Sequence, residues 1–192
     1  MPATPERLGL GFSHVVLKVR DLAAMIDFYT ETLHFEVVDR GPLKLPNRGD
    51  LPPLDSEIVF LSQDPNDHHQ LAFLPIRDDE HSGPYDHMAF RAGSLGAVRD
   101  LAHRLEGAGI GIRPVSHGNT WSCYFKDPEG NGVEVYAATP FHVTQPQVRP
   151  VDLFLDDDDL MAWTTETFGD QAGFQPIERY QTERAEHLAP DV

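Results

Sequence analysis

The sequence predicts an α+β fold in which two βαβββ modules pair into a curved mixed β-sheet. The stretch from His14 to Met25 can be laid on the stretch from His87 to Val98. Histidine then meets histidine, a basic residue meets a basic residue, and one helix-capping residue meets another. Both stretches are followed by short segments of strand-like composition. Repeated units of this kind bury a face that neither buries alone, so we expect the two modules to pack together.

The first module is predicted over residues 11–76, after an N-terminal lead-in over residues 1–10. Asp21 is a suitable N-cap, and apolar residues recur at helical spacing from there to His34. A loop is predicted where prolines and glycines are dense, over residues 41–53. Segments rich in β-branched and aromatic residues predict strands at 12–19, 35–39, 57–62 and 68–74.

The second module is predicted over residues 84–139, and modules one and two together form a single domain. Ser94 would cap a helix that ends near Gly107 and Gly109. Strands are predicted at 110–114, 121–125 and 133–137.

Residues 140–192 are predicted as a C-terminal extension that acts either as a lid or as a dimer arm. Three prolines in residues 140–150 indicate a linker. Apolar residues over 160–168 indicate a short helix, and the tail is expected to be polar and frayed from Gln181. The acidic run Asp156–Asp159 is interpreted as a solvated segment.

Composition narrows the classes of function. The 192 residues include 15 basic and 31 acidic side chains, for a net charge of −16. This balance argues against nucleic acid and anionic membranes as partners, and it favours a cationic or neutral small ligand. The single cysteine, Cys123, excludes an intramolecular disulfide. With no hydrophobic leader and no apolar run of membrane-spanning length, we expect a cytoplasmic protein.

Glu134 is the residue that first suggests chemistry. It follows a turn rich in glycine, Asp127–Gly132, and lies on an apolar strand where an unpaired carboxylate would be costly. A metal ion is one partner that would compensate it. His14 and His87 recur at matching positions of the two modules, which packing alone does not readily explain. Two imidazoles and one carboxylate make a facial triad, which suits non-haem Fe(II) and leaves open positions for dioxygen and substrate.

Several segments between residues 10 and 140 resemble one known family. They are Phe12-Ser-His-Val-Val-Leu17, Asn66-Asp-His-His-Gln-Leu-Ala-Phe73, Tyr85-Asp-His-Met-Ala-Phe90, His117 and Ser122-Cys-Tyr-Phe-Lys-Asp-Pro-Glu-Gly-Asn-Gly-Val-Glu-Val-Tyr136. They resemble the vicinal oxygen chelate superfamily (glyoxalases, bleomycin resistance proteins and dioxygenases). Within it, the chain is most similar to the one-domain type I extradiol ring-cleaving dioxygenases.

This resemblance implies the vicinal oxygen chelate fold around a metal site with His14, His87 and Glu134 as ligands. The implied cofactor is Fe(II), with Mn(II) as the alternative. The implied activity is oxidative cleavage of a catechol-type aromatic ring with O2, as in aromatic catabolism. A homo-oligomer is also expected, because modules of this superfamily commonly pair between chains.

The resemblance also implies roles for four further residues. His69 would be the acid/base residue, with His68 beside it. His117 and Tyr124 would hydrogen-bond to substrate and oxygen. The chemistry of these residue types agrees, because imidazole titrates near neutrality and a tyrosine hydroxyl can donate to an oxyanion.

Two other functions stay open at this stage. The first is a glyoxalase-type isomerase or lyase that uses Zn(II), Ni(II) or Mn(II), with a fourth ligand from His69 or Gln70. The second is a metal-free binding protein for antibiotics, whose acidic surface would suit cationic drugs. Two histidines at ligand positions argue against the second.

Overall fold

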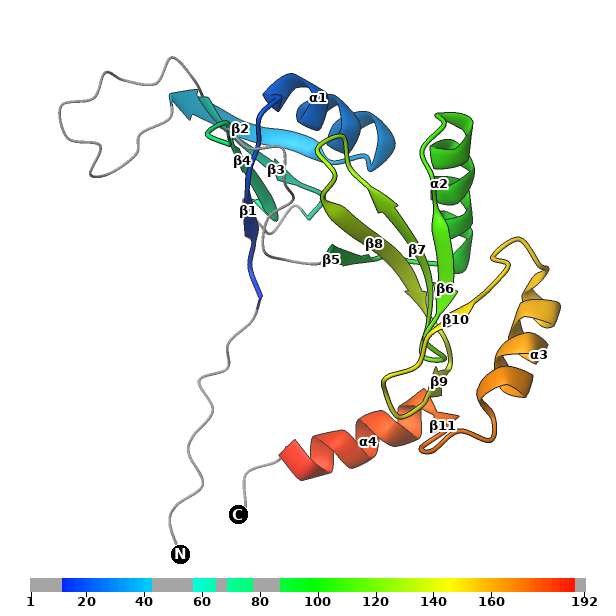
Figure 1. Ribbon diagram of the computed structural model, residues 1–192. Coiled ribbons are helices and arrows are strands. Elements are labelled where there is room, and N and C mark those ends of the chain that lie inside the picture. Colours follow the sequence, from blue (N-terminus) through cyan, green and yellow to red (C-terminus); the bar gives the residue numbers. More distant parts are fainter. Residues whose placement is uncertain (1–11, 43–56, 65–68, 78–86, 189–192) are drawn as a thin grey trace, which may run out of the picture. The chain divides into compact units, whose positions relative to one another are not determined.

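The computed structural model describes residues 12–42, 57–64, 69–77 and 87–188 (Figure 1). These residues fall into two compact units. The first unit holds the described residues up to 77 together with Asp127–Asn131. The second holds residues 87–126 and 132–188. No helix among the described residues is both long enough and apolar enough to cross a membrane.

A mixed sheet of four strands forms the first unit, in the order β1-β4-β3-β2. Its strands are β1 (Val15–Lys18), β2 (Glu36–Pro42), β3 (Glu57–Ser62) and β4 (Leu71–Leu74). The pair β1 and β4 is parallel, and the other two pairs are antiparallel. The predicted strand over 68–74 is thus shorter than expected, and His68 lies outside the described residues.

One helical segment connects β1 to β2. It begins as α1 (Leu22–Asp27), where the Asp21 carboxylate accepts a hydrogen bond from the Ala24 amide, and continues as a π-helical stretch over Phe28–Thr32. The predicted N-cap and helix are confirmed. Met25, Tyr29 and Phe73 are fully buried and form the centre of the core of this unit.

The second unit repeats this topology in a sheet of five strands, ordered β10-β6-β7-β8-β5. Its strands are β5 (His87–Arg91), β6 (Arg113–Ser116), β7 (Thr120–Lys126), β8 (Gly132–Ala138) and β10 (Arg149–Pro150). The pair β5 and β8 is parallel, as β1 and β4 are in the first unit. The predicted strand at 110–114 lies instead at Arg113–Ser116, because residues 110–112 form the connection that follows the helix.

Helix α2 (Leu95–Gly107) packs on β7 and β8 (Figure 1). The Ser94 hydroxyl accepts from the Ala97 amide, so the predicted cap is confirmed. The buried face of the helix consists of Val98, Leu101, Ala102 and Leu105. The predicted α+β fold with two βαβββ modules is therefore confirmed. The sequence predicted one curved mixed sheet for the pair, whereas the described strands of the two modules form two curved mixed sheets, one in each unit.

The C-terminal extension is more ordered than its composition suggests. It contains β9 (Phe141–His142), β10, α3 (Asp157–Phe168), β11 (Gln175–Pro176) and α4 (Ile177–Leu188). The segment interpreted as a linker therefore contains two short strands. The expectation of a frayed tail from Gln181 is wrong, because α4 continues to Leu188. A polar pattern does not distinguish an exposed helix from a tail, and an ion pair one helical turn apart, Arg179 with Glu183 at 2.9 Å, supports this helix.

Helix α3 is the predicted short helix, extended at its N-terminus by the acidic run. Asp156 caps it by accepting from the Asp159 amide, and the other acidic residues lie in its first turn, where negative charge is favourable. The run is exposed, as its interpretation as a solvated segment predicts, and it forms the start of a helix. The helix packs on β7 through a buried hydrogen bond of 2.9 Å from the Trp121 indole to the Thr164 hydroxyl.

Candidate metal centre

His87 and Glu134 meet on one face of the sheet in the second unit. In the parallel pair of β5 and β8, His87 lies opposite Gly132 and Ala89 lies opposite Glu134. Alternate residues share a face, so both side chains point the same way. Nε2 of His87 is 3.2 Å from Oε2 of Glu134. Glu134 as a residue is only 7% exposed. The buried carboxylate therefore has an imidazole partner, as its apolar strand requires.

Tyr124 and His117 extend this group along the same face. Tyr124 lies opposite Glu134 in the pair of β7 and β8, and its ring centroid is 5.2 Å from that of His87. The Tyr124 hydroxyl is 2.9 Å from Nε2 of His117, and that nitrogen is 4.0 Å from Oε1 of Glu134. The structure thus brings together four of the residues singled out from the sequence.

The C-terminal extension fixes the hydrogen-bonding role of His117. Its Nδ1 lies 2.5 Å from the main-chain carbonyl oxygen of Gln147. A carbonyl only accepts, so Nδ1 carries the proton in the neutral ring. Nε2 is then an acceptor, and the Tyr124 hydroxyl donates to it. The sequence analysis missed Gln147, because a main-chain carbonyl leaves no signal in the residue pattern.

Arg113, like Gln147, is a residue of this site that the sequence did not reveal. It begins β6 and lies opposite Tyr124 in the register. The centre of its guanidinium is 4.6 Å from the centroid of the Tyr124 ring, within the range of a cation–π contact.

His14 and His69 lie near one another in the first unit. Their ring centroids are 4.4 Å apart, and the His69 ring also contacts Phe60 at 4.9 Å. His14 is exposed, and its Nδ1 is 3.2 Å from the Ser13 hydroxyl. His14 comes just before β1, and β4 begins two residues after His69, so the parallel pairing of these strands accounts for the proximity.

The donor set suits the implied metals. Imidazole nitrogen and carboxylate oxygen are the ligands that non-haem Fe(II) takes, and they also bind Mn(II). His87 and Glu134 belong to one unit and His14 to the other. Within the described parts of the chain, no three histidine, cysteine or acidic side chains stand together as a complete metal site. The three-ligand set therefore stays a prediction.

A sequence model of the Glyoxalase/Bleomycin resistance protein/Dioxygenase superfamily matches residues 11–135. The chain belongs to this superfamily. The match covers both modules and ends within β8, just after Glu134. The resemblance inferred from the sequence is thereby confirmed at the level of the superfamily.

Three named proteins are similar to this chain in sequence or in fold. Biphenyl-2,3-diol 1,2-dioxygenase 2 of Rhodococcus globerulus is 32% identical over 70% of this chain, and the match spans 64% of that protein's length. A glyoxalase/bleomycin resistance protein/dioxygenase domain from Frankia sp. EAN1pec is 26% identical with a TM-score of 0.52, covering 68% of this chain and 98% of that one. The fosfomycin resistance protein FosX of Listeria monocytogenes, solved with Mn(II) and sulfate, has a TM-score of 0.51 at 21% identity, covering 67% and 90%. A protein of the same fold has thus been solved with a bound divalent metal ion.

In this member of the superfamily, the turn between β7 and β8 is structural. Residues Asp127–Asn131 belong to the first unit. The buried Glu129 carboxylate accepts from the amides of Arg20 and Asp21 and pairs with Arg77 at 3.4 Å. The glycine-rich turn thus contributes to the packing of the first unit.

Burial shifts the pKa of two side chains in this region, Asp127 at the start of the turn and Cys123 on β7. Burial raises the pKa of Asp127 above 3.8, although hydrogen bonds from Asn131, Glu129 and Tyr29 lower it in part. Burial also raises the pKa of the Cys123 thiol to about 12. A thiol that stays protonated is a poor nucleophile and a poor metal ligand, so Cys123 acts as a core residue.

Proposed function

We propose that this protein is a non-haem Fe(II)-dependent extradiol dioxygenase that cleaves the ring of a catechol-type aromatic with O2. The observation that carries the proposal is the buried Glu134 carboxylate beside His87, with the hydrogen-bonded Tyr124 and His117 on the same face. The 32% identity to a biphenyl-2,3-diol 1,2-dioxygenase supports it.

In this proposal His14, His87 and Glu134 hold the metal. Fe(II) is the proposed ion, and Mn(II) is the alternative. When bound, the ion would supply a site at which the two catechol oxygens and dioxygen come together. Glu134 is held by its surroundings, because its side chain is buried and its carboxylate lies 3.2 Å from His87. Such preorganisation reduces the rearrangement needed on binding.

Tyr124 and His117 form a proton relay in this proposal. The Tyr124 hydroxyl donates to Nε2 of His117 while that ring is neutral. When Nε2 takes up a proton it becomes a donor, and the Tyr124 hydroxyl is then released to donate to a substrate oxygen. The carbonyl of Gln147 accepts from Nδ1 in both states, so the ring need not turn.

His69 is the proposed acid/base residue. It would take the proton of a catechol hydroxyl and later return it, a role for which an imidazole ring is chemically suited. Its ring lies 4.4 Å from that of His14, the proposed metal ligand of the same unit. A base at this position could reach a hydroxyl bound beside that ligand. His68, proposed to assist it, lies outside the described residues.

The test is oxygen uptake by protein loaded anaerobically with Fe(II) and offered a panel of catechols. The proposal expects stoichiometric uptake and a coloured ring-fission product, both lost in Glu134→Gln. Absence of uptake across the panel would refute it. Metal retained without oxygen uptake would indicate a glyoxalase-type isomerase or lyase instead. Failure to retain any metal would indicate a metal-free binding protein.

The proposal extends to the setting of the enzyme. We place it in the cytoplasm as a homo-oligomer, with residues 11–139 as one catalytic domain and residues 140–192 as a lid or a dimer arm. The contact of Gln147 with His117 supports a role for this extension near the site. Sedimentation of the full chain and of a variant with α4 removed would test the dimer arm.

A further inference from the structure

The sheet face that carries Glu134 also carries an unexpected positive charge. The register aligns Ala89, Glu134, Tyr124 and Arg113 in one row across β5, β8, β7 and β6. Residues directly opposite one another in a sheet share a face, so Arg113 points to the same side as Glu134. Arg113 is two strand spacings from Glu134, roughly 10 Å.

Two further cations lie on this face. Lys126 is two residues beyond Tyr124 on β7, and Arg91 is two residues beyond Ala89 on β5. In a chain of net charge −16, this face thus carries three cations against one carboxylate. Within the described residues, no carboxylate forms an ion pair with any of the three. Their charge is therefore available to a ligand.

Arg113 is the cation best placed to contact a substrate. It is exposed, and its guanidinium lies over the ring of Tyr124, whose hydroxyl belongs to the proposed relay. A guanidinium above an aromatic ring keeps its N–H donors in its own plane, directed away from the ring. That fork matches the two oxygens of a carboxylate.

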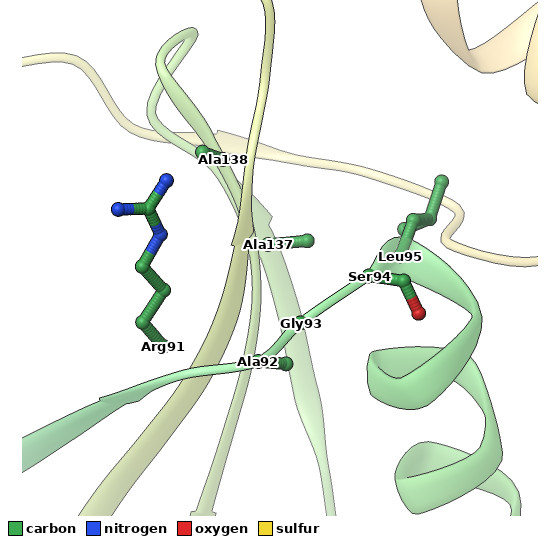
Figure 2. A pocket seen from close by; sticks show the side chains of 7 residues that line it. All are labelled: Arg91, Ala92, Gly93, Ser94, Leu95, Ala137 and Ala138. Carbon is green, nitrogen blue, oxygen red and sulfur yellow. The ribbon is translucent and has the colours of Figure 1, made fainter.

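Arg91 lies farther from the row, at the end of β5. It lines a cavity of about 460 Å³ together with Ser94, Ala137 and Ala138 (Figure 2). Arg91 thus lies at the edge of the sheet beside this cavity, while Arg113 lies beside the relay. Positive potential at a site draws anionic substrates whatever the net charge of the chain.

We infer that Arg113 binds a carboxylate on the substrate, so that the substrate class is a catechol that carries an acid group. This inference rests on the proposed function. The catechol oxygens would lie at the Glu134 end of the row and the carboxylate at the Arg113 end. The net charge of the chain favours a cationic or neutral ligand, whereas the local charge of this face favours an anionic one.

The test is anaerobic titration calorimetry of the Fe(II)-loaded full chain with 3,4-dihydroxybenzoate and with its methyl ester. The acid should bind more tightly than the ester. In Arg113→Gln, affinity for the acid should fall about tenfold to a hundredfold, as for a charge-assisted hydrogen bond, while the ester is unaffected. Arg113→Lys should retain part of the preference. Arg149→Gln is the matched control, because it removes an exposed arginine from the neighbouring β10.

Three outcomes would overturn the inference. Equal binding of acid and ester would show that the site does not read the carboxylate, while leaving the proposed function intact. A parallel loss for both ligands in Arg113→Gln would show that Arg113 only positions Tyr124. If Arg149→Gln lowers the affinity for the acid as much as Arg113→Gln does, the effect would come from the net charge of the protein and not from a contact with Arg113. If neither catechol binds and none supports oxygen uptake, the proposed function fails and the inference fails with it.

Discussion

Replacing Glu129 by alanine should destabilise the protein by about 3–5 kcal/mol, the cost of breaking a buried ion pair from one side. The side chain of Glu129 is 3% exposed and that of Arg77 is 7% exposed, with 3.4 Å between their charged atoms. The alanine would leave the Arg77 charge buried without this carboxylate. It would also remove the acceptor of the Arg20 and Asp21 amides. The contact with the Arg20 guanidinium, at 3.9 Å and 35% exposed, adds little.

Glu57→Ala is the matched control for this change. Glu57 pairs with Arg40 at 3.3 Å, but both side chains are exposed, at 38% and 53%. Its loss should cost less than about 1 kcal/mol. Glu129→Gln should fall between the two, because the amide oxygen still accepts from the main chain but carries no charge.

The assay is urea unfolding followed by far-UV circular dichroism, with midpoint and slope compared between variants. A midpoint shift for Glu129→Ala no larger than that for Glu57→Ala would refute the reasoning. It would mean that the turn Asp127–Asn131 does not hold the first unit together as its contacts indicate.

Three further predictions concern the site and the C-terminal helix. Tyr124→Phe should lower kcat roughly 10²–10³-fold with unchanged iron content, because only the donor to the developing oxyanion is lost; metal analysis and oxygen uptake check this. His69→Gln should abolish turnover but retain iron, whereas His103→Gln, which alters a histidine stacked on Phe154 at 4.2 Å, should leave both turnover and iron content unchanged; loss of iron from the His69 variant would contradict its proposed role. Burial lowers the pKa of His142 below 6.5, against the opposing effect of Glu183, so the neutral form stabilises its stack on Tyr180 at 3.5 Å. That contribution is complete above about pH 6.5 and is lost as the pH falls through the lowered pKa. The protection factors of the α4 amides, which are corrected for the pH dependence of intrinsic exchange, should therefore decrease below pH 6.5, and His142→Phe should remove this decrease.

The sequence predicts most of the topology that the two modules share. Matching His14 with His87 predicts the same topology in both modules, so β5 and β8 are parallel neighbours as β1 and β4 are. The register of β5 with β8 then places His87 and Glu134 on one face. The proximity of His87 and Glu134 follows from this arrangement. The repeat thus predicts topology and part of the site, because both depend on side-chain patterns that the sequence displays.

The missed features depend on information that residue patterns do not contain. Arg113 enters the site only through the register of β6 with β7, which a shift of a single residue would reverse. The contact of Gln147 with His117 joins a carbonyl to a ring 30 residues away in the chain. Helix α4 was missed because its residues are polar on most sides. These features follow from tertiary contacts, so the structure was needed to find them.

The contact between Gln147 and His117 bears on where this protein can be shortened. The superfamily match ends at residue 135, and a chain cut soon after β8 would keep all three proposed metal ligands. It would lose the carbonyl that keeps the proton of His117 on Nδ1. Both tautomers of the neutral imidazole would then be accessible, and in the tautomer with its proton on Nε2 the Tyr124 hydroxyl would face a donor instead of an acceptor. Such a minimal domain would keep its ligands for iron but lose the hydrogen bond that fixes which nitrogen of His117 accepts a proton.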